Sequence, residues 1–191
     1  MRAEAIARNY AETLLALAQR HGGLATAQAY LGAIEDLATL LEREPRVREF
    51  LETPRVSREQ KQQALRATLA GRVPDLFLRF TLLVVEKGRQ GLFREIALAY
   101  RDRVDELLGQ VRVQVAISHE PDALLQEEIR RALEARLGKK VIAEYRVDPE
   151  LLGGLIVRMG DEILDGSVRS RAAHLRRRLL ETRLPAPATA A

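Results

Sequence analysis

The first half of the chain repeats apolar residues with the period of an α-helix. Over residues 2–20 two apolar stripes run side by side. One stripe carries larger side chains: Ile6, Tyr10, Leu14 and Leu17. The other is built from small ones: Ala3, Ala7, Ala11 and Ala18. An apolar arc this wide exceeds what one packing partner needs. This apolar arc either packs against two elements of the same protein or leaves part of its surface free to bind another chain.

The same period predicts five more helices before residue 109. His21-Gly22-Gly23 ends the first helix, and the second covers 24–44. Pro45 begins the third helix, because proline is tolerated in a first turn. Ser57 and Gln60 form a capping box that begins the fourth. Pro74 begins the fifth and Gly88 ends it, and the last helix covers about 90–108. We therefore expect an all-α bundle of six helices over residues 1–108.

The pattern changes at Gly109. Apolar and polar residues then alternate with period two, which is typical of half-buried strands. We expect strands at 111–117, 141–147, 155–159 and 162–165, and helices at 121–137 and from 168 onward. Gly160 and Asp161 make the hairpin turn, and Ser167 is a helix N-cap. The sequence thus predicts a multidomain chain, with a smaller α/β domain over 109–184 and a disordered tail over 185–191.

Composition narrows the class of protein. Apolar residues make up 47% of the 191 residues, aromatic residues only 4%, and tryptophan is absent. The net charge is +4 with both signs interspersed, which argues against a dedicated nucleic-acid binder. There is no cysteine, so disulfides and thiolate metal sites are excluded. No apolar run is long enough to span a membrane, and the first ten residues do not resemble a secretory signal.

Candidate catalytic and ligand-binding groups are few. Asp161, Glu162 and Asp165 are paired carboxylates, but they flank a turn with no nucleophile nearby in sequence. The three histidines lack metal-ligand spacing. Gly153 and Gly154 are followed by no phosphate-binding motif. We therefore expect no catalytic residue, no metal and no cofactor.

The last predicted helix is rich in arginine. Residues 169–183 hold six arginines and one acidic residue, Glu181. Such a helix could contact nucleic acid or an anionic lipid surface. The more common interpretation of such a helix is a solvated face opposite its apolar stripe, which consists of Val168, Ala172, Leu175 and Leu179.

A dense motif links the hairpin to this helix. Its fixed positions are Gly153, Gly154, Val157, Arg158, Gly160, Asp161, Ile163, Asp165, Gly166, Ser167, Val168 and Arg169. This pattern resembles the C-terminal signature of the delta subunits of bacterial F-type ATP synthase, the family that includes the mitochondrial oligomycin-sensitivity-conferring protein. The first half is similar to the same family at two segments: Arg8, Tyr10, Ala11 and Leu14, and then Glu86, Gly88, Arg89 and Leu92. Only 184–191 falls outside the resemblance.

The resemblance implies a non-catalytic stator subunit in the peripheral stalk of a proton-translocating ATP synthase. The bundle would bind the N-terminal helix of an alpha subunit, and the α/β domain would bind the C-terminal region of subunit b. For the arginine-rich helix the resemblance implies a third role, as a face for an acidic partner helix. The protein would be monomeric alone and present as one copy per complex. It would be a peripheral protein at the cytoplasmic face of the cell membrane, and it would have no nucleic-acid partner. The alternative is a basic nucleic-acid-binding module. The implied alpha-binding residues are Ala7, Tyr10, Ala11, Leu14, Phe80, Leu83 and Val84.

Overall fold

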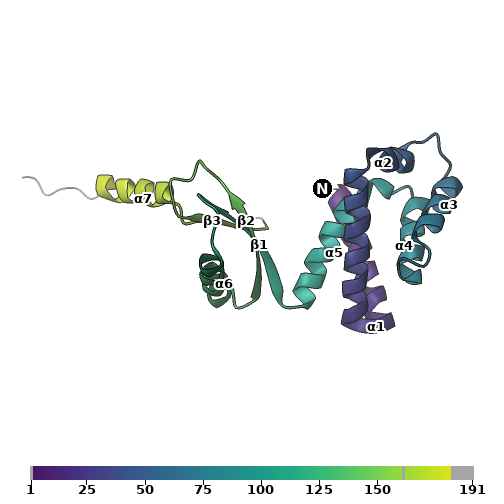
Figure 1. Ribbon diagram of the computed structural model, residues 1–191, viewed down its shortest axis with the longest axis horizontal. Coiled ribbons are helices and arrows are strands. Elements are labelled where there is room, and N and C mark those ends of the chain that lie inside the picture. Colours follow the sequence, from purple (N-terminus) through teal and green to yellow (C-terminus); the bar gives the residue numbers. More distant parts are fainter. Residues whose placement is uncertain (1, 161, 182–191) are drawn as a thin grey trace, which may run out of the picture. The chain divides into compact units, whose positions relative to one another are not determined.

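The computed structural model describes residues 2–160 and 162–181, and it divides the chain into two compact units. The N-terminal unit is Met1–Leu108 and the C-terminal unit is Gly109–Ala191 (Figure 1). The division falls at Gly109, where the hydrophobic period changes from helix to strand. The expected tail at 185–191 lies outside the described residues.

The N-terminal unit is entirely helical. Its elements are α1 Arg2–Arg43, α2 Pro45–Glu52, α3 Arg58–Leu69, α4 Asp75–Glu86, the short 3-10 helix η1 Gln90–Leu92 and α5 Phe93–Leu107. The helix expected from residue 90 therefore begins as a 3-10 turn, which is common at helix N-termini. The capping box is confirmed: Ser57 Oγ accepts from the Gln60 amide at 3.2 Å, and Gln60 Oε1 accepts from the Ser57 amide at 3.1 Å.

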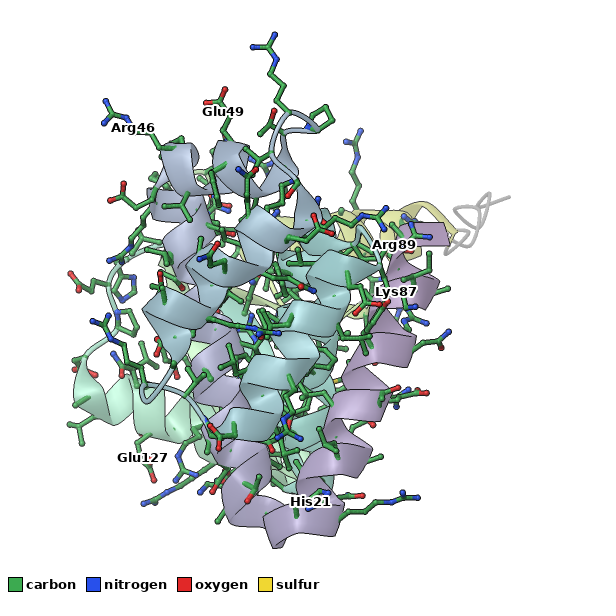
Figure 2. The ribbon with its side chains drawn as sticks, turned by 90° about the vertical axis from the view of Figure 1, so that its right-hand side faces the viewer. His21, Arg46, Glu49, Lys87, Arg89 and Glu127 are labelled. Carbon is green, nitrogen blue, oxygen red and sulfur yellow. The ribbon has the colours of Figure 1, made fainter. Side chains whose placement is uncertain are left out.

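The element α1 spans the first two expected helices, and its helical geometry is interrupted between them, so the count of six helices is not confirmed. Within α1, Gly22 (φ 167°, ψ 11°) and Gly23 (φ 64°, ψ −142°) leave helical geometry. The chain reverses direction there, with His21 beside the turn, and the two arms of α1 run side by side (Figure 2). Glycine permits such a turn because it has no Cβ to restrict its backbone.

Small residues of α1 form its buried face. Ala7, Ala11, Leu14 and Ala18 are buried, whereas Ile6, Tyr10 and Leu17 of the larger stripe are only half-buried. The principal partner of α1 is α5, whose Phe93, Ile96, Tyr100 and Val104 join the same core. Small side chains let two helices approach closely, so Ala7, Ala11 and Ala18 form the inner face together with Leu14, while Ile6, Tyr10 and Leu17 lie nearer the surface.

Tyr100 ties α5 to α1 by a polar contact inside this core. Its hydroxyl donates to the carbonyl of Ala27 at 3.1 Å, and the side chain is fully buried. Burial raises the pKa of Tyr100, and the neighbouring Tyr30 raises it further. The folded state thus favours the neutral phenol, whereas the unfolded chain ionises near pH 10. Stability from this group is complete below about pH 10 and falls as the pH rises beyond it.

We expect Tyr100→Phe to lower the free energy of unfolding by about 1 kcal/mol at pH 7, the net worth of one hydrogen bond. Above about pH 10 the difference should shrink or reverse, because the variant has no buried phenol to ionise there. Denaturant titrations at pH 7 and pH 10.5 measure both effects. Tyr145→Phe is the comparison in the C-terminal unit: the Tyr145 hydroxyl donates to Gln126 O at 2.9 Å and burial raises its pKa as well, so its difference should also shrink above about pH 10. A constant difference across pH would contradict this account of Tyr100.

The C-terminal unit is a four-stranded sheet with two helices. Its elements are β1 Gln110–Ile117, α6 Ala123–Leu137, β2 Lys140–Val147, β3 Leu155–Met159, β4 Glu162–Asp165 and α7 Val168–Glu181. The strand order is β2-β1-β3-β4. β1 pairs in parallel with β2 across the α6 crossover, and antiparallel with β3, which forms a hairpin with β4. The expected strands are therefore confirmed, although Asp161 of the hairpin turn lies outside the described residues.

One face of the sheet packs on α6. The expected alternation is confirmed by the core, which consists of Val113, Val115, Ile117, Ile129, Leu133, Val141 and Val157. The helix starts two residues later than the proline suggests, because Asp122 is its N-cap and accepts from the Leu125 amide at 2.8 Å. Gly138 ends it in the left-handed conformation. Within residues 2–160 and 162–181, no helix is both long and apolar enough to cross a membrane.

Candidate functional site

The first candidate surface lies where the N-terminal arm of α1 meets α4. The rings of Tyr10 and Phe80 meet edge to face with centroids 6.1 Å apart, which joins the two helices. Phe80 is buried, whereas Leu83, one turn further along α4, leaves 43% of its surface exposed. Ile6 and Leu17, on the same stripe of α1 as Tyr10, are half-buried. Apolar side chains from two neighbouring helices therefore remain open to solvent.

The sequence proposed seven residues for this surface, and the structure separates them. Five lie in the core of the N-terminal unit: Ala7, Ala11, Leu14, Phe80 and Val84. Their side chains face the bundle because α4 and α5 pack on the small-residue face of α1. Of the seven, only Tyr10 and Leu83 are accessible to a partner helix, which we call the guest helix. Ile6 and Leu17, which the helical period already placed on the stripe of Tyr10, were not included in the expected set.

Charged residues border this surface at one end. Lys87 and Arg89, which follow the last turn of α4, lie beside the purple N-terminal arm of α1 in Figure 2. Both side chains are exposed. A guest helix seated on Tyr10 and Leu83 would thus have basic side chains at that end.

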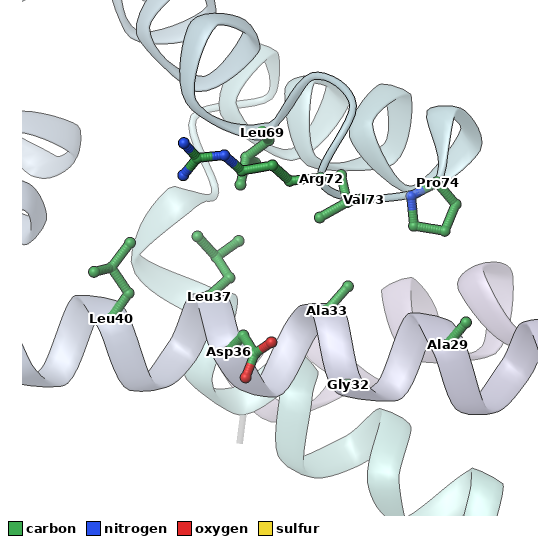
Figure 3. A pocket seen from close by; sticks show the side chains of 10 residues that line it. All are labelled: Ala29, Gly32, Ala33, Asp36, Leu37, Leu40, Leu69, Arg72, Val73 and Pro74. Carbon is green, nitrogen blue, oxygen red and sulfur yellow. The ribbon is translucent and has the colours of Figure 1, made fainter.

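A second hollow lies on the other arm of α1. It measures about 460 Å³ and is lined by the C-terminal arm of α1 and the loop between α3 and α4. Figure 3 shows Leu37 and Ala33 facing Val73 across it, with Asp36 and Arg72 at its sides. Leu40 also lines this hollow and is 38% exposed. The lining is largely apolar, without convergent polar groups of the kind that catalysis requires.

The glycine-rich motif positions α7. The Val168 amide donates to the Gly153 carbonyl at 3.0 Å, and the Gly166 amide donates to the Leu155 carbonyl at 2.9 Å. Gly154 has φ +81°, and a Cβ there would lie 2.5 Å from the Gly166 carbonyl oxygen. The loop before β3 therefore presses directly on the backbone that begins α7, which only glycine permits.

Ser167 is the expected N-cap of α7. Its hydroxyl accepts from the Ser170 amide at 3.2 Å, and its own amide donates to Asp165 Oδ1 at 2.9 Å. Hydrogen bonds from the hydroxyl and amide of Ser167 lower the pKa of Asp165. Asp165 thus supports the cap, which is the structural role expected for it. Gly160 has φ +56°, as the hairpin requires, and Arg158 and Arg169 are exposed.

The second candidate surface is α7 itself. No other described element packs extensively against it, and it projects away from the sheet of its own unit (Figure 1). Val168 is 49% exposed and Leu175 is 59% exposed. An unpacked apolar stripe on a helix of 14 residues is unusual, because most helical stability in proteins comes from packing such a stripe.

Comparison with known proteins gives a consistent result. A family model described as ATP synthase delta (OSCP) subunit matches residues 6–179. The ATP synthase subunit delta of Gemmatimonas aurantiaca is 37% identical over 180 residues, covering 94% of this chain and 96% of the relative. That of Symbiobacterium thermophilum is 38% identical, covering 92% and 93%. A chain in the cryo-EM structure of the Toxoplasma gondii mitochondrial ATP synthase hexamer matches with TM-score 0.66 and 27% identity, covering 91% and 97%.

Proposed function

The chain belongs to the ATP synthase delta (OSCP) subunit family, and we propose that its two units hold two different partners by two different surfaces. It is a stator subunit of the peripheral stalk and catalyses no reaction of its own. The central shaft exerts torque on the catalytic head, so an untethered head would turn with it. The protein carries that load and thereby couples rotation to ATP synthesis.

The N-terminal unit binds the N-terminal helix of an alpha subunit. The observation that carries this proposal is the exposure of large apolar side chains beside Tyr10 and Leu83, while the small-residue stripe of α1 is buried. An amphipathic helix laid on an apolar surface is a common mode of recognition. The basic residues Lys87 and Arg89 at one end favour a guest with acidic side chains there.

The binding free energy that this contact needs can be compared with the free energy gained by burying the apolar residues of the surface. A nanomolar contact corresponds to about 12 kcal/mol. Burying one large apolar side chain contributes about 1.5–3 kcal/mol. Ile6, Tyr10 and Leu17 are already half-buried and Leu83 is 43% exposed, so together they would supply roughly 3–6 kcal/mol, a part of what a tether that rarely opens requires.

The C-terminal unit binds the C-terminal region of subunit b, and α7 is the surface that supports this part of the proposal. One copy of the chain serves each complex. The complex, in turn, places it at the cytoplasmic face of the cell membrane as a peripheral protein. The family assignment favours this function over a nucleic-acid-binding module.

Leu83→Asp should weaken binding of an alpha N-terminal peptide at least tenfold, because a carboxylate replaces a leucine that the guest would bury. Leu98→Asp is the matched control: Leu98 on α5 is also 43% exposed, and its replacement should change affinity less than twofold. Tyr10→Asp should weaken binding as well. Isothermal titration measures affinity, and circular dichroism verifies the fold. Equal losses from Leu83→Asp and Leu98→Asp would refute this surface.

A further inference from the structure

Four aromatic rings form a continuous row through the N-terminal unit, which we call the aromatic row. Tyr10 meets Phe80 edge to face, with ring centroids 6.1 Å apart and an angle of 75° between the ring planes. Phe80 meets Phe77 at 6.4 Å, and Phe77 meets Tyr30 at 5.9 Å. All three separations are typical of attractive aromatic pairs. The row therefore connects the N-terminal arm of α1, α4 and the C-terminal arm of α1.

The aromatic row is exposed only at its outer end. Tyr10 is half-buried and lies on the first candidate surface. Phe80 is buried, and Phe77 and Tyr30 are each only 1% exposed. A guest helix can therefore contact the ring of Tyr10, but it cannot reach Phe77 or Tyr30.

The inner end of the row lies among packed side chains. Phe77 and Tyr30 belong to the core of the N-terminal unit. Tyr30 lies close enough to Tyr100 to raise the pKa of its phenol, and the Tyr100 hydroxyl donates to the carbonyl of Ala27 at 3.1 Å. Side chains in a packed interior are restricted to defined rotamers. The inner rings thus give the outer ones a fixed support.

Aromatic contacts fix the orientation of a ring as well as its position. The positive edge of one ring is attracted to the negative face of the next, which favours edge-to-face and tilted pairs. A leucine could occupy much of the same space without this preference. A surface side chain that is ordered in advance loses less conformational freedom when a partner binds, and this increases affinity.

We propose that Phe77 is a positioning residue for the guest helix, although it makes no contact with it. Phe77 fixes the ring of Phe80, and Phe80 in turn holds the ring of Tyr10 in the orientation that the guest helix meets. This rests on the proposed function and deepens it, because the affinity of the first candidate surface then depends on a residue inside the core.

Phe77→Leu and Phe93→Leu are a matched pair of variants. Phe93 is also 1% exposed and lies in the same core, but within the described residues it makes no ring-to-ring contact. Phe77→Leu should weaken binding of an alpha N-terminal peptide about threefold to tenfold, the cost of ordering one or two side chains on binding. Phe93→Leu should change the affinity less than twofold.

Isothermal titration of the full chain measures these affinities, and circular dichroism verifies that each variant is folded at the temperature used. Equal losses of affinity in the two variants would show that Phe77 acts only through the stability of the core, which would overturn the proposal.

A double-mutant cycle tests whether Phe77 acts through Tyr10. In the Tyr10→Leu background there is no outer ring to position, so adding Phe77→Leu should change the affinity for the peptide less than twofold. Two changes that act independently would instead multiply their effects. The full effect of Phe77→Leu in this background would overturn the proposal.

A spectroscopic measurement tests the positioning without any guest. The full chain is labelled with 3-fluorotyrosine, and the fluorine resonance of Tyr10 is assigned by its loss in Tyr10→Phe. Phe77→Leu should shift this resonance clearly more than Phe93→Leu does, because Phe80 is no longer fixed. A Tyr10 resonance that ignores Phe77→Leu would overturn the inference even if the alpha peptide binds. Conversely, a shifted resonance in a chain that binds no alpha peptide would leave the positioning intact and show the proposed function of this surface to be wrong.

Discussion

Leu14→Ala is expected to lower the free energy of unfolding of the N-terminal unit by about 3 kcal/mol, the cost of a cavity in a packed core. Leu14 has no exposed surface and lies in the core that α1 and α5 share. For a unit of this size, the midpoint of thermal unfolding should fall by roughly 10–20 °C. Thermal and urea unfolding, followed by circular dichroism, measure the effect.

Leu83→Ala is the matched control for Leu14→Ala. Both leucines were expected at the alpha-binding surface, but Leu83 is 43% exposed. Its truncation should cost well under 1 kcal/mol, because surface substitutions rarely exceed about 0.5 kcal/mol. If Leu14→Ala were as stable as Leu83→Ala, the division of the first candidate surface into core and exposed residues would be wrong.

Gly154→Ala is expected to have the second large effect, on the C-terminal unit. The backbone at Gly154 has φ +81°, a conformation that costs an alanine about 1–2 kcal/mol. The new methyl group would also meet the Gly166 carbonyl oxygen at 2.5 Å, so the start of α7 must move. We expect a total loss of about 3 kcal/mol or more, a large fraction of the stability of a small domain.

Gly160→Ala separates the two causes. Gly160 also has a positive φ, +56°, but a Cβ there would meet no heavy atom within 4 Å. It should therefore cost only about 1–2 kcal/mol, the backbone strain alone. Hydrogen exchange at the Val168 amide, which bonds the Gly153 carbonyl, should accelerate in Gly154→Ala and not in Gly160→Ala. Similar behaviour of the two variants would show that the close contact with α7 is unimportant.

Local chemistry made much of this fold predictable. The capping box at Ser57, the left-handed cap at Gly138 and the N-cap at Ser167 are each satisfied by residues within four positions in the sequence. The strands follow their alternation because one face of the sheet is buried. The sequence analysis began α6 at residue 121 and did not recognise Asp122 as its N-cap. An acidic residue just before an apolar run is a common N-cap.

The amino-acid sequence by itself determined which residues share a face, because the helical and strand periods fix the direction of each side chain along its own element. It thereby placed Tyr10 with Ile6 and Leu17, and it placed Val168, Ala172 and Leu175 on one face of α7. Only the tertiary structure decided which face is buried. The alanine stripe of α1 is inside because α5, some 90 residues further along the chain, packs closely on small side chains. Leu83 stays exposed and α7 stays unpacked because no described element of their own unit covers them. Whether a face is buried depends on which distant segments of the chain pack against it. The periodicity of one segment carries no information about that packing.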